Sequence, residues 1–432
     1  MTAIGRMQLI LFITLLLITL TVSNSSSDGE TVLKPGDRGP KVLALQGDMQ
    51  KLGYLSDAPT GYYGEITRDA VKKLQEEYHL NPDGMVGLET NQLINRLVSS
   101  LKVTEKEVLG FFVGEEPVIP SSLETLRVQK DKITSISPFW YRLDRNNPGQ
   151  LEIGSNVTRE EMDNVISFNK KNGVKTYALV HNLLYGKSVI GRDVVHSVLT
   201  DPDRRGELVT NIFNLLKSRG FDGVTIDIEN IYPGDRGLFI QFLAELSARL
   251  DPGGYTVITC VPAKTSDKHN GGWGDNFDYH EVGKYSDLVA IMAYDEHGSF
   301  SKSGGPIASI GWVERVVEYA LTKLPPEKIL LGIPGYGFDW NVDQGSSRYL
   351  SYELAMQTAH RFEKSVAWDS ENKVPYFNYL DNNGNRHSVY FENARSTAAK
   401  LDMVNKYNLN GIAIWRLGME DPGSWPVIAE KL

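Results

Sequence analysis

The sequence predicts an α/β protein: a (β/α)8 TIM barrel with a small α+β insertion near its seventh strand, preceded by a small three-helix domain. Eight short apolar segments alternate with amphipathic helical segments from Val108 to the end of the chain. This region of about 325 residues fits a barrel, which commonly needs about 250, plus one insertion. A doubly wound open sheet is the alternative. It usually carries a glycine-rich phosphate loop after its first strand, and VLGFFVGEEPVIP has none.

Length and charge limit the classes of function. The chain has 432 residues and a net charge of -9, so it is long enough for two or more domains. The negative charge argues against a nucleic-acid partner, because phosphates favour a basic surface, and the sequence predicts no protein partner. One cysteine, Cys260, excludes an intramolecular disulfide, and the eight histidines form no cluster with metal-ligand spacing. We therefore expect neither a metal nor a cofactor.

Residues 1–27 are typical of a signal peptide. One arginine, Arg6, precedes the apolar run QLILFITLLLITLTV, and the polar stretch SNSSSDGE follows it. The run is shorter than the ~20 apolar residues of a spanning helix, and we expect cleavage near Ser23. An uncleaved anchor is the alternative, because the cleavage site is not a clean A-x-A. The segment predicts a secreted protein.

Residues 28–98 are expected to form the three-helix domain. The segment PKVLALQGDMQKLGYL places Val42, Leu45 and Met49 at helical spacing and stops at Gly53. A second segment, TRDAVKKLQEEYHL, repeats this layout, and both contain V-x-x-L-Q. The turn-rich stretches YYGEIT and NPDGMVG follow the first and the second helix.

The barrel is expected to occupy residues 107–432, after a linker at 99–106. Its strand candidates are VLGFFV, ITSISPF, TYALVH, GVTIDIE, TVITCVP, LVAIMAY, ILLGIP and GIAIW. Among the helices, TREEMDNVISFNKKNG begins at a Thr158/Glu161 capping box and ends at Gly173. Residues from Asp339 to Glu392 hold a hairpin signal, Asn-Asn-Gly-Asn, and are predicted to form the insertion that walls one side of a groove.

Two carboxylates end the fourth predicted strand, FDGVTIDIEN. Alternate side chains of a strand share a face, so Thr225, Asp227 and Glu229 point into the barrel. Glu229 comes last, at the C-terminal end where barrel active sites lie. Buried carboxylates are costly unless they are paired or functional, and two in series suit a proton donor and a neighbour that tunes it. A structural carboxylate held by an arginine or by backbone donors is the alternative.

Three motifs resemble glycoside hydrolase family 18. FDGVTIDIEN matches the D-x-D-x-E signature at Asp227 and Glu229, with Thr225 where chitinases of the family have the first Asp. IMAYDEHGS matches M-x-Y-D at Met292, Tyr294 and Asp295, and GIAIWRLG places Trp415 where the family has the tryptophan that floors the sugar site. The resemblance covers residues 108–432 and is closest to the spore cortex-lytic and cell-wall N-acetylglucosaminidases.

The resemblance implies substrate-assisted catalysis, in which the 2-acetamido group of the substrate is the nucleophile. Glu229 would protonate the leaving oxygen and then act as base, while Asp227 would orient the acetamido group and stabilise the oxazolinium ion. Tyr294 would hold the acetamido oxygen, and Trp415 would stack under the sugar. Because Thr225 is not a carboxylate, Asp227 lacks the like-charge neighbour that would raise its pKa.

Further aromatic residues at strand ends are candidates for lining the groove. Trp140 follows the second strand, and Tyr336 and Trp340 follow the seventh. Sugars bind by stacking on such rings, so we expect all three to contact substrate, with Trp340 the strongest candidate. Asp295 and Met292, at the end of the sixth strand, complete the predicted substrate-binding set together with Thr225.

The N-terminal unit resembles the small three-helix peptidoglycan-binding domain. GDRGPKV, LQGDMQKLGYL, YYGEITRDAVKKLQ and NPDGMVGLET carry this resemblance. Together the two resemblances imply a secreted hydrolase of a cell wall or spore envelope that acts on peptidoglycan or another N-acetylglucosamine polymer. A chitinase is the near alternative. A catalytically inactive, lectin-like barrel is the alternative from another class, although such barrels typically lose the acid that Glu229 retains.

Overall fold

We describe a computed structural model of the chain. The described residues are 32–432 except 79, 102–105, 115–118, 185–189 and 269–271, and the predicted signal peptide lies outside them. Contacts divide the chain into two compact units, residues 1–104 and 105–432, and each is described by itself. The predicted limits at residues 27, 98 and 106 remain predictions. In the described part of the chain, no helix is long and apolar enough to cross a membrane.

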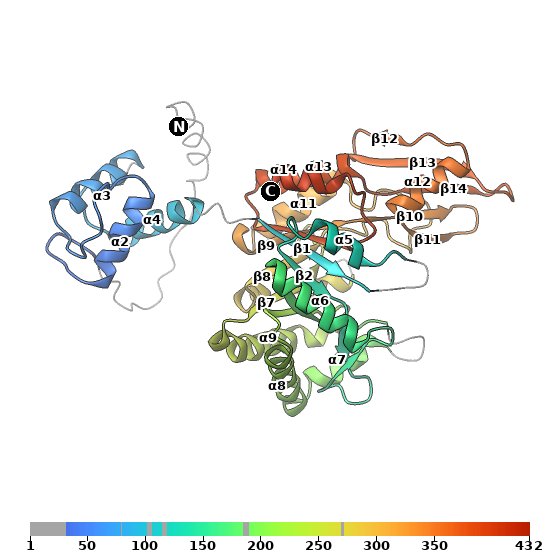
Figure 1. Ribbon diagram of the computed structural model, residues 1–432, viewed down its shortest axis with the longest axis horizontal. Helices are drawn as coiled ribbons and strands as arrows, with labels where there is room; N and C mark the ends of the chain where they lie inside the picture. Colours follow the sequence, from blue (N-terminus) through green and yellow to red (C-terminus); the bar gives the residue numbers. More distant parts are fainter. Residues whose placement is uncertain (1–31, 79, 102–105, 115–118, 185–189, 269–271) are drawn as a thin grey trace. The chain divides into compact units, whose positions relative to one another are not determined.

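The N-terminal unit packs three helices around one apolar core (Figure 1). They are α2 (Pro40–Lys51), α3 (Glu65–Glu77) and α4 (Leu88–Leu101). The core contains the apolar positions predicted from helical spacing, among them Val42, Leu45 and Met49. The predicted three-helix domain is therefore confirmed.

The repeated V-x-x-L-Q segments each supply a buried glutamine that fixes the loop after its helix. Gln46 Nε2 donates to the Tyr62 carbonyl at 2.9 Å, and Gln75 Nε2 donates to the Met85 carbonyl at 2.9 Å. Each glutamine also accepts a backbone N–H of the same loop through its amide oxygen, at 2.8 Å. The repeat thus has a structural role, because each amide links its helix to the backbone of the loop that follows.

The second unit is a closed barrel of eight parallel strands, and the predicted fold is confirmed. Its strand order is β2-β1-β15-β9-β8-β7-β6-β5, and pairing of β2 with β5 closes the ring. The strands are β1 (Glu107–Phe112), β2 (Ser135–Pro138), β5 (Lys175–His181), β6 (Gly223–Asp227), β7 (Thr256–Pro262), β8 (Leu288–Met292), β9 (Ile329–Pro334) and β15 (Gly411–Trp415).

Helices cover the outside of the barrel (Figure 1). They are α5 (Ser122–Gln129), α6 (Arg159–Asn172), α7 (Gly191–Leu199), α8 (Pro202–Arg219), α9 (Arg236–Leu250), α10 (Tyr279–Lys284), α11 (Ile310–Leu321), α13 (Ala394–Lys406) and α14 (Ser424–Lys431). Outward side chains of the strands, such as Val224 and Ile226, pack against them, and a separate apolar cluster fills the barrel interior. A short hairpin of β3 (Tyr141–Leu143) and β4 (Leu151–Ile153) extends the sheet beside β5.

The predicted insertion is a five-stranded antiparallel sheet with one helix. Its strands follow the order β11-β10-β14-β13-β12. They are β10 (Tyr336–Asn341), β11 (Ser346–Ser351), β12 (Ala367–Asp369), β13 (Val374–Leu380) and β14 (Arg386–Tyr390), with α12 at Tyr352–Arg361. The sheet begins at Tyr336, three residues before the predicted start, and β13 and β14 pair as a hairpin around the predicted turn.

Candidate active site

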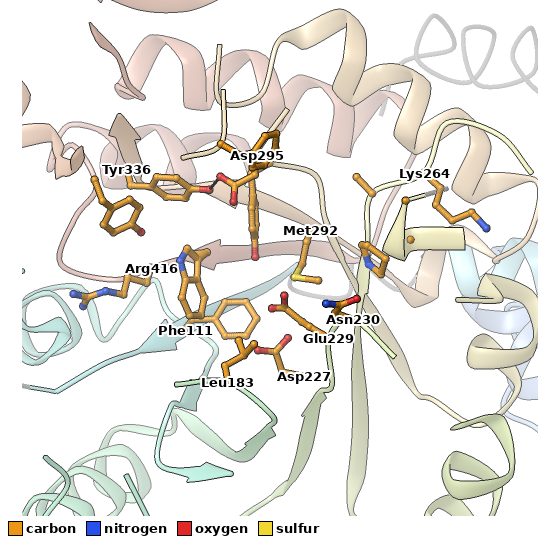
Figure 2. Close-up of a pocket in the computed structure, with 18 of the residues that line it drawn as sticks. Phe111, Leu183, Asp227, Glu229, Asn230, Lys264, Met292, Asp295, Tyr336 and Arg416 are labelled. Atoms are coloured by element: carbon orange, nitrogen blue, oxygen red, sulfur yellow. Dashed lines mark hydrogen bonds between the residues drawn. The ribbon is translucent and has the colours of Figure 1, made fainter. Parts of the chain in front are cut away.

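A pocket of about 860 Å³ opens at the C-terminal ends of the barrel strands. Strand β6 ends there, and its alternation directs Thr225 and Asp227 into the barrel. Thr225 lies below the pocket floor, fully buried, and its hydroxyl hydrogen-bonds Ser137 of β2 at 2.6 Å. Asp227 and Glu229 both line the pocket, and Figure 2 shows their carboxyl groups facing the same space. Thr225 therefore supports the site from below and does not contact a ligand in the pocket.

The surroundings of the two carboxyl groups favour their protonated forms. Burial raises the pKa of Asp227, and a hydrogen bond with the Cys260 thiol partly offsets this rise in the pKa. Burial also raises the pKa of Glu229, and the negative charges of Asp227 and Asp295 raise it further. Glu229 therefore retains its proton toward neutral pH, as a general acid must.

Asp227 has a raised pKa although Thr225 is not a carboxylate. The predicted lack of a like-charge neighbour at that position removes one possible cause of a raised pKa, and burial supplies another. The side chain of Asp227 is only 3% exposed, so desolvation alone raises the pKa without a third carboxylate on the strand.

The segment after β8 brings three predicted residues to the pocket, Met292, Tyr294 and Asp295. Asp295 has a left-handed backbone, with φ of 60°, and accepts a hydrogen bond from the Tyr336 hydroxyl (Figure 2). Burial raises the pKa of Tyr294, and the nearby Cys260 and carboxylates raise it further. The Tyr294 hydroxyl therefore keeps its proton and can donate a hydrogen bond. The predicted Tyr336 thus lines the pocket and also positions Asp295.

Trp415 lies at the end of β15 and lines the pocket as predicted. Two phenylalanine rings pack against its indole ring. The ring centroids of Phe111 and Trp415 are 5.3 Å apart, and those of Phe139 and Trp415 are 5.6 Å apart. Phe111 and Phe139 line the same pocket, so the three rings form an apolar wall on which one face of a sugar can pack.

Two predicted groove residues, Trp140 and Trp340, are buried outside the pocket, and these predictions are wrong. Trp140 is 1% exposed and packs in the core between barrel and helices, because the chain directs its neighbour Phe139 into the groove instead. Trp340 is also 1% exposed, and its Nε1 donates to the Gly298 carbonyl at 3.1 Å. It supports the loop that follows β8 and does not line the groove.

Asn182 is a site residue that the sequence reasoning missed. It follows β5, is 2% exposed, and holds the backbone of Glu229 from both sides. Asn182 Nδ2 donates to the Glu229 carbonyl at 2.7 Å, and its Oδ1 accepts the Glu229 N–H at 2.8 Å. The signal in the sequence was that Asn182 directly follows His181 at the end of a predicted strand. The double hydrogen bond fixes the segment from which the acid projects.

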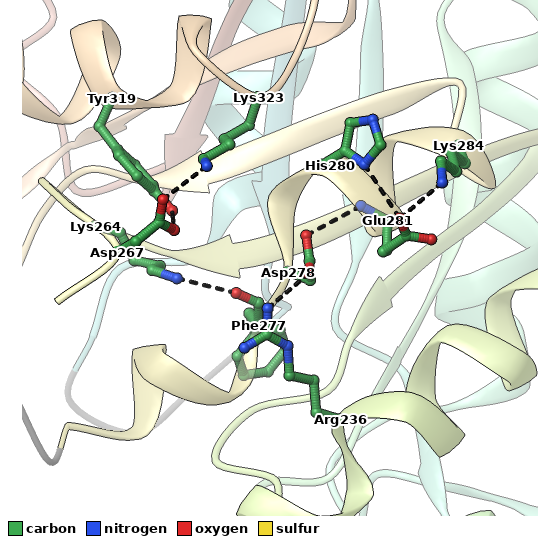
Figure 3. A network of polar contacts seen from close by, with 10 residues as sticks. All are labelled: Arg236, Lys264, Asp267, Phe277, Asp278, His280, Glu281, Lys284, Tyr319 and Lys323. Carbon is green, nitrogen blue, oxygen red and sulfur yellow. Dashed lines mark hydrogen bonds and ion pairs between the residues drawn. The ribbon is translucent and has the colours of Figure 1, made fainter. Parts of the chain in front are cut away.

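The loop after β7 forms a further wall of the pocket and is anchored by polar contacts (Figure 3). Lys264 donates to the Phe277 carbonyl at 3.2 Å and so links the two ends of the loop. Asp267 accepts from the Tyr319 hydroxyl at 2.6 Å and from Lys323 at 2.7 Å, which attaches the loop to α11 and the residues just after it. These contacts hold the wall without using the carboxylates of the pocket.

Polar side chains and aromatic rings share the lining of the pocket. Within the described ranges, no group of three or more His, Cys, Asp or Glu side chains could hold a metal ion. The pocket offers a substrate two carboxyl groups, a tyrosine hydroxyl and an aromatic wall.

A barrel with a buried carboxylate pair at the C-terminal end of a strand, beside an aromatic wall, has the site of a glycosidase. Residues 190–420 match the family described as "Glycosyl hydrolases family 18", which is more than half of the chain. The chain belongs to this family and is a glycosylase, as the three sequence motifs predicted. Residues 38–94 match "Putative peptidoglycan binding domain", which confirms the nature of the N-terminal unit.

Two of the similar proteins come from species of Bacillus. The "Putative sporulation-specific glycosylase YdhD" of Bacillus subtilis (strain 168) is 38% identical over 58% of this chain and 60% of that protein. The "Cortical fragment-lytic enzyme" of Bacillus anthracis is 33% identical over 55% of this chain and 56% of that enzyme. The chain thus spans less than two thirds of the length of these two relatives.

Solved structures share the barrel. The Bacillus cereus spore cortex-lytic enzyme SleL has a TM-score of 0.68 and 26% identity, covering 76% of this chain and 74% of that one. A chitinase from Chromobacterium violaceum has a TM-score of 0.69 and 28% identity, covering 76% of this chain and 98% of that one.

Proposed function

We propose that the chain is a secreted glycosidase that cleaves β-1,4 bonds next to N-acetylglucosamine in peptidoglycan. The observation that carries this proposal is the pocket of a family 18 barrel, in which Glu229 lies beside Asp227 in surroundings that favour its protonated form. The peptidoglycan-binding domain on the same chain and the cortex-lytic enzymes among its relatives support a wall or spore-cortex polymer as substrate.

The proposed reaction proceeds in two steps. In the first, the acetamido oxygen of the substrate attacks C1, the bond from C1 to the glycosidic oxygen breaks, and Glu229 gives its proton to that oxygen. Asp227 accepts a hydrogen bond from the acetamido N–H and stabilises the oxazolinium ion, and Tyr294 holds the acetamido oxygen in position. In the second, water attacks C1, the oxazolinium ring opens, and Glu229 takes a proton from the water, so the anomeric configuration is retained.

A chitinase is the second candidate, because the Chromobacterium violaceum chitinase matches this barrel over 98% of its length. Chitin and peptidoglycan both present N-acetylglucosamine to the reacting position, so the pocket chemistry is the same for both. Lectin-like barrels typically lose the acid, and the presence of Glu229 in the pocket argues against the predicted lectin-like alternative.

Digestion of purified peptidoglycan, spore cortex and chitin by the wild type and by Glu229→Gln tests this proposal. Mass spectrometry of borohydride-reduced products identifies the sugar at each new chain end. We expect new reducing-end N-acetylglucosamine from peptidoglycan or cortex with the wild type only, because the amide of the variant cannot protonate the leaving oxygen. Cleavage of chitin alone would favour the chitinase, and binding without cleavage by either protein would favour the lectin.

A further inference from the structure

A second pocket, of about 310 Å³, lies in the inserted sheet and takes no part in the reaction described so far. Strand β10 separates it from the catalytic groove. Successive side chains of a strand point to opposite faces of its sheet. Tyr336 and Phe338 therefore face the groove, whereas Asp339 and Asn341 line the second pocket on the other face. No described residue lines both pockets, so a ligand can bind here while the groove is occupied.

The floor of the second pocket is a row of polar side chains that crosses four strands. The register of β11, β10, β14 and β13 places Ser346, Asn341, His387 and Tyr379 next to one another on one face. Helix α12 covers the neighbouring part of this face and ends at Arg361, which lines the pocket. The pocket is therefore built where the helix stops and the sheet continues.

The two acidic side chains of the second pocket already have donors from the protein. Asp339 accepts hydrogen bonds from the Tyr379 hydroxyl at 2.7 Å and from Arg348 Nη2 at 3.1 Å. His387 Nδ1 lies 2.7 Å from the same carboxyl group. Asp381 Oδ1 accepts two backbone N–H groups of the turn after β13, each at 2.8 Å. These acids thus hold the walls of the pocket together.

The two arginines of the second pocket, in contrast, have donors to offer. The side chain of Arg348 is 55% exposed, and a guanidinium group has five N–H donors, of which the bond to Asp339 uses one. Arg361 is exposed as well, and both arginines line the pocket. Paired N–H groups of guanidinium suit a carboxylate. Because Asp339 and Asp381 also line the pocket, its charge is balanced, which favours a single carboxylate over a doubly charged phosphate.

We propose that the second pocket binds the terminal carboxylate of a short peptide, with Arg348 and Arg361 as its partners. Phe362, whose ring stacks on Tyr379 with centroids 4.3 Å apart, gives the pocket an apolar side for the side chain of the peptide. Peptidoglycan carries peptide stems. If the chain acts on peptidoglycan, the inserted sheet would hold a stem of a neighbouring strand while the groove holds a glycan, and this last step rests on the proposed function.

Titration of the full chain with acetyl-D-alanyl-D-alanine and with its C-terminal amide tests this inference. His387 lines the pocket, so the ¹⁵N resonances of its ring report binding there and not at the N-terminal domain. We expect the acid to shift these resonances and the amide to leave them in place. Arg361→Gln should raise the Kd of the acid about tenfold, because one charge-assisted hydrogen bond is lost.

Arg315→Gln is the matched control, because it removes an exposed arginine of α11 that lies outside both pockets. It should leave the Kd unchanged. Equal binding of acid and amide would overturn the inference, as would an unmoved His387 or an Arg361→Gln variant that binds like the wild type. Binding of a free peptide needs neither a glycan nor cleavage, so this result is independent of whether the groove hydrolyses peptidoglycan.

Discussion

At the scale of single residues, Asp227 and Glu229 have different partners although they lie only two positions apart, at the end of β6 and just after it. Asp227 is buried and has the Cys260 thiol as its hydrogen-bond partner, whereas the backbone of Glu229 is held by Asn182. The carboxyl group of Glu229 faces the groove, where a leaving oxygen can reach it. The two acids can therefore carry out separate roles in one reaction.

The charge of Asp227 should set the alkaline limb of the pH profile. Glu229 must be protonated to act, so activity falls as pH rises through its pKa. Replacing Asp227 by Asn removes a negative charge that raises the pKa of Glu229, so the alkaline limb of kcat/KM should move to lower pH. We also expect kcat to fall by about 10²–10³-fold, because stabilisation of the developing positive charge is lost.

A matched control for this variant is Asp222→Asn, at the other end of the same strand. Asp222 accepts the Thr176 N–H at 2.8 Å and lies outside the pocket. It should leave the alkaline limb in place. An unchanged limb in Asp227→Asn would contradict the assignment of Glu229 as the titrating acid.

Asn182 should act as a positioning residue for the acid. We expect Asn182→Ala to lower kcat for natural glycans by about 10²-fold with little change in KM, because general acid catalysis is worth about 10²–10⁴-fold and depends on placement. A substrate with a dinitrophenyl leaving group needs no proton from Glu229, so its hydrolysis should lose much less. Steady-state kinetics on both substrates measure this split.

Asn211→Ala is the control for Asn182→Ala. Asn211 Nδ2 donates to the Gly149 carbonyl at 2.8 Å from α8, outside the pocket, so both variants remove an asparagine that holds a backbone carbonyl. Asn211→Ala should change kcat by the same factor for natural glycans and for the dinitrophenyl substrate. Equal losses on both substrates in Asn182→Ala would show that Asn182 supports the fold and not the acid.

Positions in the pocket were predicted correctly for most of the motif residues, whereas a strand end alone predicted Tyr336 correctly and Trp140 and Trp340 wrongly. The motifs placed Asp227, Glu229, Tyr294 and Trp415, and the structure brings all four to the pocket. A strand end does not say which of two neighbours turns inward, and this is why Phe139 lines the pocket in place of the predicted Trp140.

At the scale of elements, local signals predicted boundaries well. Helix α6 begins after Thr158, whose side chain accepts the Glu161 N–H, and ends at Gly173 in a left-handed conformation, as the capping residues indicated. The sequence did not predict which side chains of β10 line the groove. Tyr336 and Phe338 line the groove, but the loop after β8 covers Trp340, and sequence cannot show which loop folds over a strand.

An ion pair where the inserted sheet returns to the barrel should be essential to stability. Lys400 Nζ lies 2.7 Å from Glu392 Oε2, and both side chains are at most 3% exposed. We expect Lys400→Met to lower the free energy of unfolding by about 3–5 kcal/mol, because it leaves a buried carboxylate without its cation. Urea unfolding of the full chain measures this change.

The double variant Lys400→Met, Glu392→Leu is the matching control for this pair. It replaces both charges by apolar groups, which is often neutral for a buried pair. It should recover most of the loss. A double variant as unstable as Lys400→Met alone would mean that shape at this junction, and not the unpaired charge, determines stability.

At the scale of the whole molecule, the alternation of strands and helices predicted the barrel because each barrel strand was visible as an apolar run. What the sequence did not contain was the short β3–β4 hairpin beside β5, whose strands have three residues each. Segments of that length carry too few alternations to be recognised. The glutamine repeat of the N-terminal unit was visible as a motif, but its role in fixing loops became clear only from the hydrogen bonds.

The apolar cluster that fills the barrel interior reaches the catalytic carboxyl groups from below, and the groove reaches them from above. Leu109, Tyr177, Ile258 and Leu330 belong to this cluster, and Cys260, the partner of Asp227, belongs to it as well. Apolar side chains of this cluster therefore pack beneath the buried carboxyl group of Asp227. Glu229 lines the groove, so water in the groove can return the proton that it releases, and reprotonation is then coupled to the entry of water and the departure of the cleaved glycan.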